Sequence, residues 1–295
     1  MSRRAIPAWF AVCAAATLAG LATASPPIGE AEVLRGLAYL PADRAEKADL
    51  YLPVDAGTAL RPAVVVIHGG GWISEARDSN REENIARALA ERGIASLSID
   101  YLLGNEEGTR VCWPQNLHDC KTAVRWLRRH ARQYRLDPDR IGAIGGSAGG
   151  HLAAMLAVTG PECGLDPAAP FGDLSCRIQG AIDMYGPADL ENWRDVQALC
   201  ATRSEAPELY KAFSVLTYVS SDDPPILMIQ GDLDGVTPVS QSEALAARLA
   251  AHGVEHRLEI VQGAGHSFDL QPDQRDLRPL AAEFFHQRLR PPANR

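Results

Sequence analysis

The sequence predicts an α/β fold in which helices cover both faces of a mostly parallel central sheet. Short apolar runs alternate along the chain with segments of helical periodicity. The run from Ala63 to Ile67 is apolar and largely β-branched, as in a strand buried on both faces of a parallel sheet. The 295 residues are 46% hydrophobic and 22% charged, which is the composition of a globular protein with a substantial core.

The predicted strands are short runs rich in apolar and β-branched residues. In chain order they span residues 33–40, 49–53, 63–67, 94–99, 141–144, 178–185, 226–230 and 257–261. The strands after the first two alternate with helical segments, and this rhythm favours parallel pairing through helical crossovers.

The predicted helices repeat apolar residues every three or four positions. They span residues 84–92, 117–134, 151–158, 242–251 and 280–289. Gly93 follows the first of them and suits the position just past a helix end, where the left-handed conformation is common. Residues 186–217 contain no clear strand, and we expect them to form a small cap insertion over a site.

The first 24 residues have the three parts of a secretory signal peptide. Arg3 and Arg4 supply positive charge, an apolar stretch follows from Trp9 to Leu21, and the segment ends in Ala22-Thr23-Ala24. The apolar stretch is shorter than the ~20 residues of a membrane span, so we expect cleavage rather than a retained anchor. The mature protein is then residues 25–295, one α/β domain that is secreted or periplasmic, with no stable membrane association.

The net charge and the cysteines of the chain limit the classes of function that fit the sequence. The chain has 29 Lys and Arg against 37 Asp and Glu, a net charge of −8, which excludes a typical nucleic-acid binder. Export would place the five cysteines of the mature protein in an oxidising compartment, where two disulfides and one free thiol are expected. We expect Cys163 to pair with Cys176 and, as a weaker second pair, Cys112 with Cys120. No cysteine has a histidine at zinc-ligand spacing, and we expect no metal or cofactor.

The strongest local motif is Gly145-Gly146-Ser147-Ala148-Gly149-Gly150, between a predicted strand and a predicted helix. Its G-x-S-x-G pattern indicates a serine nucleophile on a sharp, strained turn, where larger residues than glycine would clash. No lysine follows the glycines, so a Walker loop is excluded. Another phosphate-binding glycine loop and a plain tight turn stay open as alternatives.

A second glycine motif, His68-Gly69-Gly70-Gly71-Trp72, follows the strand at 63–67. Successive glycines let backbone N–H groups approach a developing oxyanion. We predict that Gly70 and Gly71 donate to the oxyanion together with Ala148. His68 is expected to hold the loop, and the alternative is a simple strand-to-helix turn.

A serine nucleophile needs a base, and the base needs an orienting acid. Of eight histidines, His266 is the best candidate, because it follows the last predicted strand in a glycine-flanked loop. His151 lies close to Ser147 along the chain, but on the following helix it would lean back over its own turn.

Two carboxylates after the strand at 226–230 compete for the role of acid. We choose Asp234, which lies deeper in its loop, and expect Asp232 to brace the loop by accepting from local N–H groups. Asp269 is a third, more remote candidate. The resulting chain order of serine, aspartate and histidine is that of α/β-hydrolases.

Taken together, these motifs resemble the α/β-hydrolase superfamily and, within it, carboxylesterases of the hormone-sensitive-lipase and acetylxylan or feruloyl esterase-like (BD-FAE-like) branch. The resemblance extends from about Val33 to Leu289. It implies that Ser147 is the nucleophile, Asp234 the acid and His266 the base of an ester hydrolase, and it leaves the substrate open.

The expected function is a secreted serine esterase for short acyl esters, with acetyl or feruloyl groups on polysaccharide among its candidate substrates. Its partners are then small-molecule or polysaccharide esters and not nucleic acid. Three alternatives stay open: a prolyl-oligopeptidase-like peptidase, an arylformamidase, and a catalytically silent α/β-hydrolase domain used for binding.

Overall fold

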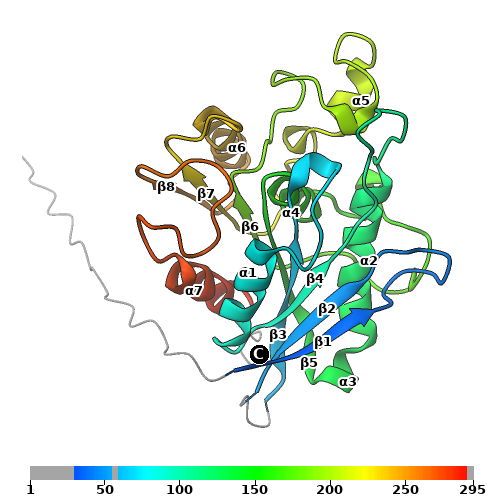
Figure 1. The fold of residues 1–295 in the computed structure, drawn as a ribbon, viewed down its shortest axis with the longest axis vertical. Coiled ribbons are helices and arrows are strands. Elements are labelled where there is room, and N and C mark those ends of the chain that lie inside the picture. The colour runs from blue at the N-terminus through cyan, green and yellow to red at the C-terminus, as the bar shows by residue number, and fades with distance from the viewer. Residues whose placement is uncertain (1–29, 55–58, 291–295) are drawn as a thin grey trace, which may run out of the picture.

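The structure, a computed structural model, describes residues 30–54 and 59–290. The predicted signal peptide, residues 1–24, lies outside the described residues. Eight strands form one sheet in the order β1-β2-β4-β3-β5-β6-β7-β8 (Figure 1). Their bounds are β1 Ala31–Leu37, β2 Ala48–Pro53, β3 Arg61–Ile67, β4 Ala95–Ile99, β5 Leu136–Gly146, β6 Ala181–Met184, β7 Ile226–Gly231 and β8 His256–Val261. β2 is antiparallel to both of its neighbours, and the pairs from β4 to β8 are parallel.

The sheet is buried on both faces, as the sequence of β3 predicts. Val65 and Ile67 pack into one hydrophobic core, and Val64 and Val66 pack into the other. Because successive side chains of a strand point to opposite faces, an uninterrupted apolar run is the sequence that such a strand needs.

Five long helices cover the two faces. The helices α1 (Asn80–Ala90) and α7 (Arg278–Arg288) share one core, whereas α2 (Gln115–Arg129), α4 (Ala148–Val158) and α6 (Val239–Ala251) pack on the other face. Figure 1 shows α1 and α7 lying together on one side of the strands. The predicted fold class is confirmed: this is an α/β-hydrolase fold.

Helix boundaries differ from the prediction at several places. The helix expected at 117–134 is interrupted at His130 (φ −101°, ψ 11°), after which α3 spans Ala131–Tyr134. α1 begins at Asn80 rather than at residue 84. α4 begins at Ala148 rather than at residue 151, so the helix includes Gly149 and Gly150. Glycines are poor helix formers, but close packing against the sheet requires them at these two positions. Gly93 has a φ of +83° after α1, as predicted.

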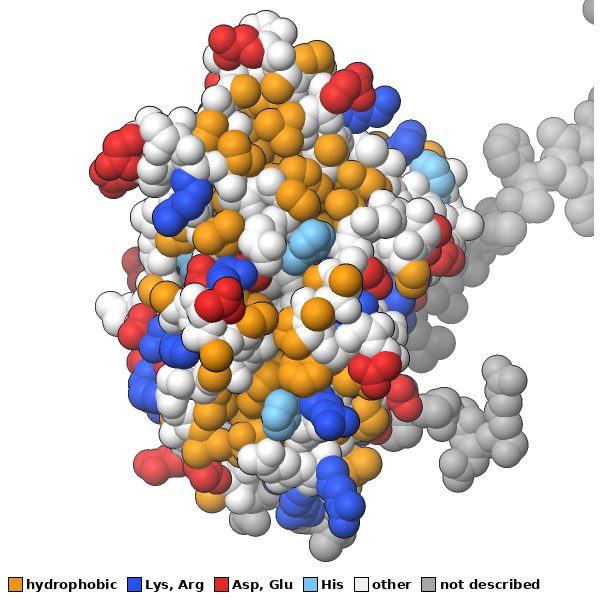
Figure 2. All heavy atoms as spheres, turned by 90° about the vertical axis from the view of Figure 1, so that its right-hand side faces the viewer, with side chains coloured by type: hydrophobic (Ala, Val, Ile, Leu, Met, Phe, Trp, Pro, Cys, Tyr) orange, Lys and Arg blue, Asp and Glu red, His pale blue; other side chains and the backbone are white. Residues whose placement is uncertain are grey.

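Within residues 186–217 the structure has one α-helix, α5 (Pro207–Ala212), and two 3₁₀ turns, η3 (Gln197–Leu199) and η4 (Val215–Thr217). The backbone N–H groups of Ala188 and Asp189 donate to Oε1 of Gln241 on α6. The Phe213 ring packs on Trp72, with ring centroids 5.0 Å apart. In Figure 2, hydrophobic side chains gather in the upper half of the face shown, towards the end where α5 lies in Figure 1.

The predicted disulfides are not supported, because all five described cysteines are free thiols. Cys163 donates to the carboxylate of its neighbour Glu162, whereas burial raises the pKa of the Cys176 thiol to about 11. Cys112 and Cys120 are both buried, and Cys112 accepts from the Asn116 amide at 3.3 Å. Spacing along the chain therefore failed to identify bonded partners. Within residues 30–54 and 59–290, no helix combines the length and apolar character of a membrane span.

Candidate active site

Ser147 lies on the sharp turn between β5 and α4, with φ 57° and ψ −120°. Such a conformation is costly for a residue with a side chain and persists where the surroundings enforce it. A Cβ on Gly149 would lie 2.0 Å from the carbonyl oxygen of Ile67, and one on Gly145 would lie 2.3 Å from the backbone of Gly149. The motif's glycines are therefore required by backbone-to-backbone packing that holds the turn against the end of β3.

Three loops at the carboxyl ends of the strands bring the predicted triad residues together. The Ser147 hydroxyl donates to Nε2 of His266 at 2.9 Å, and Nδ1 of His266 donates to Oδ2 of Asp234 at 2.7 Å. These contacts join residues 119 and 32 positions apart in sequence. The arrangement can transfer a proton from the serine hydroxyl while the carboxylate orients the imidazole.

The carboxylate of Asp234 is fully buried and well supplied with donors. Its Oδ1 accepts from the backbone N–H groups of Val236 and Thr237, at 2.8 and 2.9 Å. Its Oδ2 accepts from Nε2 of Gln230 at 3.0 Å, in addition to His266. Sequence reasoning did not identify Gln230, which is buried on β7, and only the fold of the following loop could have revealed its contact.

The other candidates for the acid and the base of the triad have different hydrogen-bond partners. Oδ1 of the exposed Asp232 accepts from the N–H of Gly263 at 2.6 Å, so this residue braces the loop that carries His266. Asp269 accepts from the Asn84 amide at 2.8 Å. Nε2 of His151 is 2.7 Å from the carbonyl oxygen of Phe213, and burial lowers the pKa of His151 to about 4. None of the three side chains is hydrogen-bonded to the Ser147 hydroxyl, whose partner is His266.

The loop at residues 68–72, called here the oxyanion loop, follows β3. Gly70 and Gly71 have φ angles of +77° and +61°, in the region that favours glycine. They open a 3₁₀ turn and Ala148 opens α4, so their N–H groups come at helix starts, where intrahelical acceptors are absent. The start of α4 also favours negative charge through the helix dipole. These N–H groups can stabilise an oxyanion that forms beside Ser147.

His68 and Tyr101 anchor the oxyanion loop. The Tyr101 hydroxyl donates to the carbonyl oxygens of His68 and Gly69, at 3.0 Å each, and its ring stacks on His68 with centroids 4.2 Å apart. Burial lowers the pKa of His68 to about 4, so the ring is neutral at pH 7. This geometry fits a loop-holding side chain rather than a proton carrier.

Two buried carboxyl groups lie behind the site. Asp183 on β6 accepts from the N–H of Gly186 at 2.8 Å, and burial raises its pKa to about 7. Glu82 on α1 is bonded to Arg81, and burial raises its pKa to about 7 against the opposing effect of that arginine. One oxygen of each carboxyl group finds no hydrogen-bond partner among the described residues.

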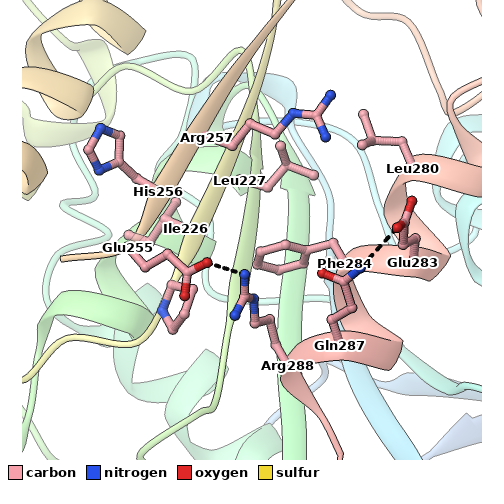
Figure 3. Close-up of a pocket in the computed structure, with 11 residues that line it drawn as sticks. Ile226, Leu227, Glu255, His256, Arg257, Leu280, Glu283, Phe284, Gln287 and Arg288 are labelled. Carbon is pink, nitrogen blue, oxygen red and sulfur yellow. Dashed lines mark hydrogen bonds and ion pairs between the residues drawn. The ribbon is translucent and has the colours of Figure 1, made fainter. Parts of the chain in front are cut away.

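The opposite end of the sheet has a cavity but different chemistry. A cavity of about 380 Å³ lies between α7 and the amino ends of β7 and β8, with Phe284 and an ion pair of Glu255 and Arg288 among its lining side chains (Figure 3). It contains no serine or cysteine. Across the described part of the chain, no group of three or more His, Cys, Asp or Glu side chains is placed to hold a metal ion.

Comparison with known proteins identifies a matching family model and esterases of similar sequence. The BD-FAE family model matches residues 48–249. Esterase LipQ of Mycobacterium tuberculosis is 31% identical over 79% of this chain and 56% of its own length. The chain thus spans little more than half the length of this curated relative.

Solved structures share the whole fold. A truncated carbohydrate esterase from gut microbiota has a TM-score of 0.77 and 25% identity, covering 90% of this chain and 99% of its own. Esterase Est2 of Thermogutta terrifontis, solved with propionate bound, has a TM-score of 0.72 and 27% identity, covering 91% of this chain and 98% of its own. Both neighbours match the chain almost from end to end of their own structures.

Proposed function

Because the chain belongs to the BD-FAE family of α/β-hydrolase esterases, we propose that it hydrolyses short-chain acyl esters through an acyl-enzyme on Ser147. The observation that carries the proposal is the continuous hydrogen-bonded series from the Ser147 hydroxyl through His266 to Asp234. A buried carboxylate, an imidazole held in one tautomer and a serine on a strained turn are the parts that acyl transfer needs.

The proposed reaction has two halves. Nε2 of His266 takes the hydroxyl proton while Oγ of Ser147 attacks the ester carbonyl, and the N–H groups of Gly70, Gly71 and Ala148 stabilise the tetrahedral oxyanion. The protonated imidazole then gives its proton to the departing alcohol as the acyl-enzyme forms. A water molecule, deprotonated by the same imidazole, hydrolyses the acyl-enzyme and restores Ser147.

Acetyl or feruloyl groups on polysaccharide are the proposed natural substrate class. One support is the structural similarity to a carbohydrate esterase from gut microbiota. The other is the similarity to Est2, whose structure holds propionate, a short-chain carboxylate. The cap segment at 186–217 contacts the oxyanion loop through Phe213 and Trp72, and this contact supports the proposal that the segment shapes the substrate pocket.

The testing experiment compares p-nitrophenyl esters from acetate to dodecanoate, acetate release from acetylated xylan, and a proline-containing peptide anilide. We expect the acetate and butyrate esters to be cleaved fastest, and Ser147→Ala to abolish turnover. Removing one oxyanion donor should cost about 10²- to 10³-fold in rate. Near-normal esterase activity in Ser147→Ala would contradict the mechanism, and a preference for the peptide would favour a peptidase.

We also propose that the protein is exported and that residues 1–24 are removed, on the basis of the N-terminal sequence alone. The mature chain would then begin at Ser25. Expression of the full chain in a bacterial host, followed by intact mass measurement of the periplasmic protein, tests this. A full-length mass in the cytosolic fraction would contradict it.

A further inference from the structure

The first turn of α1 carries an arginine whose position is closely defined. The Arg81 side chain is only 11% exposed, and its Nε donates to Oε1 of Glu82 at 2.8 Å. Its Nη2 donates to the carboxylate of Glu75 in the loop that precedes α1. Because two carboxylates hold different edges of the planar guanidinium, the group has little freedom to turn.

Two glycines show how close this guanidinium lies to the backbone of the candidate active site. A Cβ on Gly69 would lie 2.8 Å from Nη2 of Arg81, and a Cβ on Gly146 would lie 3.2 Å from its Nε. Gly69 directly precedes the proposed oxyanion donors, and Gly146 directly precedes Ser147. The Cβ position of Gly69 is also 2.9 Å from the carbonyl oxygen of Gly146. One guanidinium therefore packs against both backbones where they meet.

Glu75 adds backbone strain to the same cluster. Its φ is +66°, an unfavourable value for a residue with a side chain. A Cβ on Gly70 would lie 3.0 Å from Cγ of Glu75, so the glutamate stem packs directly on an oxyanion donor. The bond from Arg81 helps to hold Glu75 in this conformation.

The cluster extends to the loop that carries His266. The Tyr185 hydroxyl is 2.7 Å from the Cβ position of Gly146 and donates to the carbonyl oxygen of Phe268. The Tyr185 ring lies 4.8 Å from the imidazole of His266, centroid to centroid. Arg81 therefore lies where the oxyanion loop packs against the turn that carries Ser147, called here the nucleophile turn. Tyr185 connects this place to the loop that carries His266.

We propose that Arg81 is a positioning residue that holds the oxyanion loop against the nucleophile turn in the geometry that acyl transfer requires. This role rests on the proposed esterase function. Without the guanidinium, Glu75 loses its partner and the Gly69 backbone loses a packing surface. The oxyanion donors then shift relative to Ser147, and a displacement of about 1 Å can cost about 10²-fold in rate. Arg81 itself is not expected to touch the substrate.

The experiment compares Arg81→Ala and Arg81→Lys with Arg77→Ala as the matched control. Arg77 also donates to two carboxylates, those of Asp49 and Asp100, and it lies in the segment that leads into α1. Its side chain is not among the nearest atoms around Gly69 or Gly146. Loss of ion pairing alone should therefore affect both alanine variants alike.

Two rates are measured: phosphonylation of Ser147 by a fluorophosphonate probe, followed by intact mass, and hydrolysis of p-nitrophenyl acetate. We expect Arg81→Ala to lower the phosphonylation rate and kcat by about 10- to 100-fold, with KM changed by less than about threefold. Arg81→Lys should recover part of the loss, because it restores the charge without the planar fork. Arg77→Ala should stay within about twofold of the wild type in both rates.

A wild-type phosphonylation rate in Arg81→Ala, or an equal loss in Arg77→Ala, would overturn the proposal. If Arg81→Ala does not fold, Arg81→Lys decides: a lower kcat at unchanged KM supports the role, and wild-type kinetics overturn it. Failure of the probe to label Ser147 in the wild type would overturn the proposed esterase function itself, and this positioning role with it.

Discussion

The two ends of the parallel sheet differ in how their residues are held. At the carboxyl ends, Ser147 and Glu75 have positive φ angles, and the carboxylate of Asp234 is fully buried. At the amino ends, none of the residues that line the cavity of Figure 3 has a positive φ. The ion pair there is open to solvent, with Glu255 58% and Arg288 29% exposed.

This difference shows that cavity volume alone does not locate chemistry. The cavity between α7 and β8 has a volume of about 380 Å³, but its ion pair is exposed to solvent and none of its lining residues has a positive φ. The triad end combines a strained backbone with a buried carboxylate; both features cost stability and are expected where function requires them. Four predictions test this difference between the two ends of the sheet.

The largest effect is expected where a buried carboxylate orients the base. Asp234→Asn should lower kcat for p-nitrophenyl acetate by about 10⁴-fold, because an amide does not hold His266 in the required tautomer. Asp232→Asn should lower kcat by less than about tenfold, since Asp232 braces Gly263 instead. A larger loss in Asp232→Asn would exchange the roles of the two residues.

The second prediction concerns the nucleophile turn. Gly149→Ala should destabilise the protein by more than about 4 kcal/mol or prevent folding, because its Cβ would meet the Ile67 carbonyl oxygen at 2.0 Å. Gly235→Ala is the matched control, because nothing lies within 4 Å of its Cβ position. Thermal unfolding of both variants checks this. A Gly149→Ala protein as stable as Gly235→Ala would show that the turn is not held by this contact.

These contrasts also explain how much the sequence could predict. The strands of the sheet and the association of Ser147, Asp234 and His266 follow from local signals: apolar runs, glycine motifs and their order along the chain. Gln230 and Arg81 carry no such signal. Arg81 contacts Gly146 only because the sheet brings these distant segments of the chain together. Whether two cysteines form a disulfide likewise depends on their distance in the fold, which their spacing along the chain does not encode.

The third prediction tests the buried carboxyl group behind the site. Burial raises the pKa of Asp183 from its ordinary 3.8 to about 7, so the folded protein holds this proton more tightly than the unfolded chain. The contribution of Asp183 to stability should therefore fall as pH rises from about 4 to about 7, by about 4 kcal/mol, and level off above that range.

Asp183→Asn removes this titration while leaving an oxygen to accept from Gly186. Relative to the wild type, the variant's melting temperature should rise steadily between pH 4 and 7 and then stay constant. A difference between the two proteins that does not change with pH would contradict the raised pKa of Asp183.

The smallest effect is expected at the amino ends of the strands. Glu255→Gln removes the ion pair with Arg288 on the rim of the cavity (Figure 3). Exposed ion pairs contribute about 0 to 1 kcal/mol, and salt screens them, so the change in unfolding free energy should stay below about 1 kcal/mol and shrink in 1 M NaCl. Denaturant unfolding at low and high salt measures this change, and p-nitrophenyl acetate hydrolysis should be unaltered. A substantial loss of kcat in Glu255→Gln would mean that this end of the sheet is coupled to the triad.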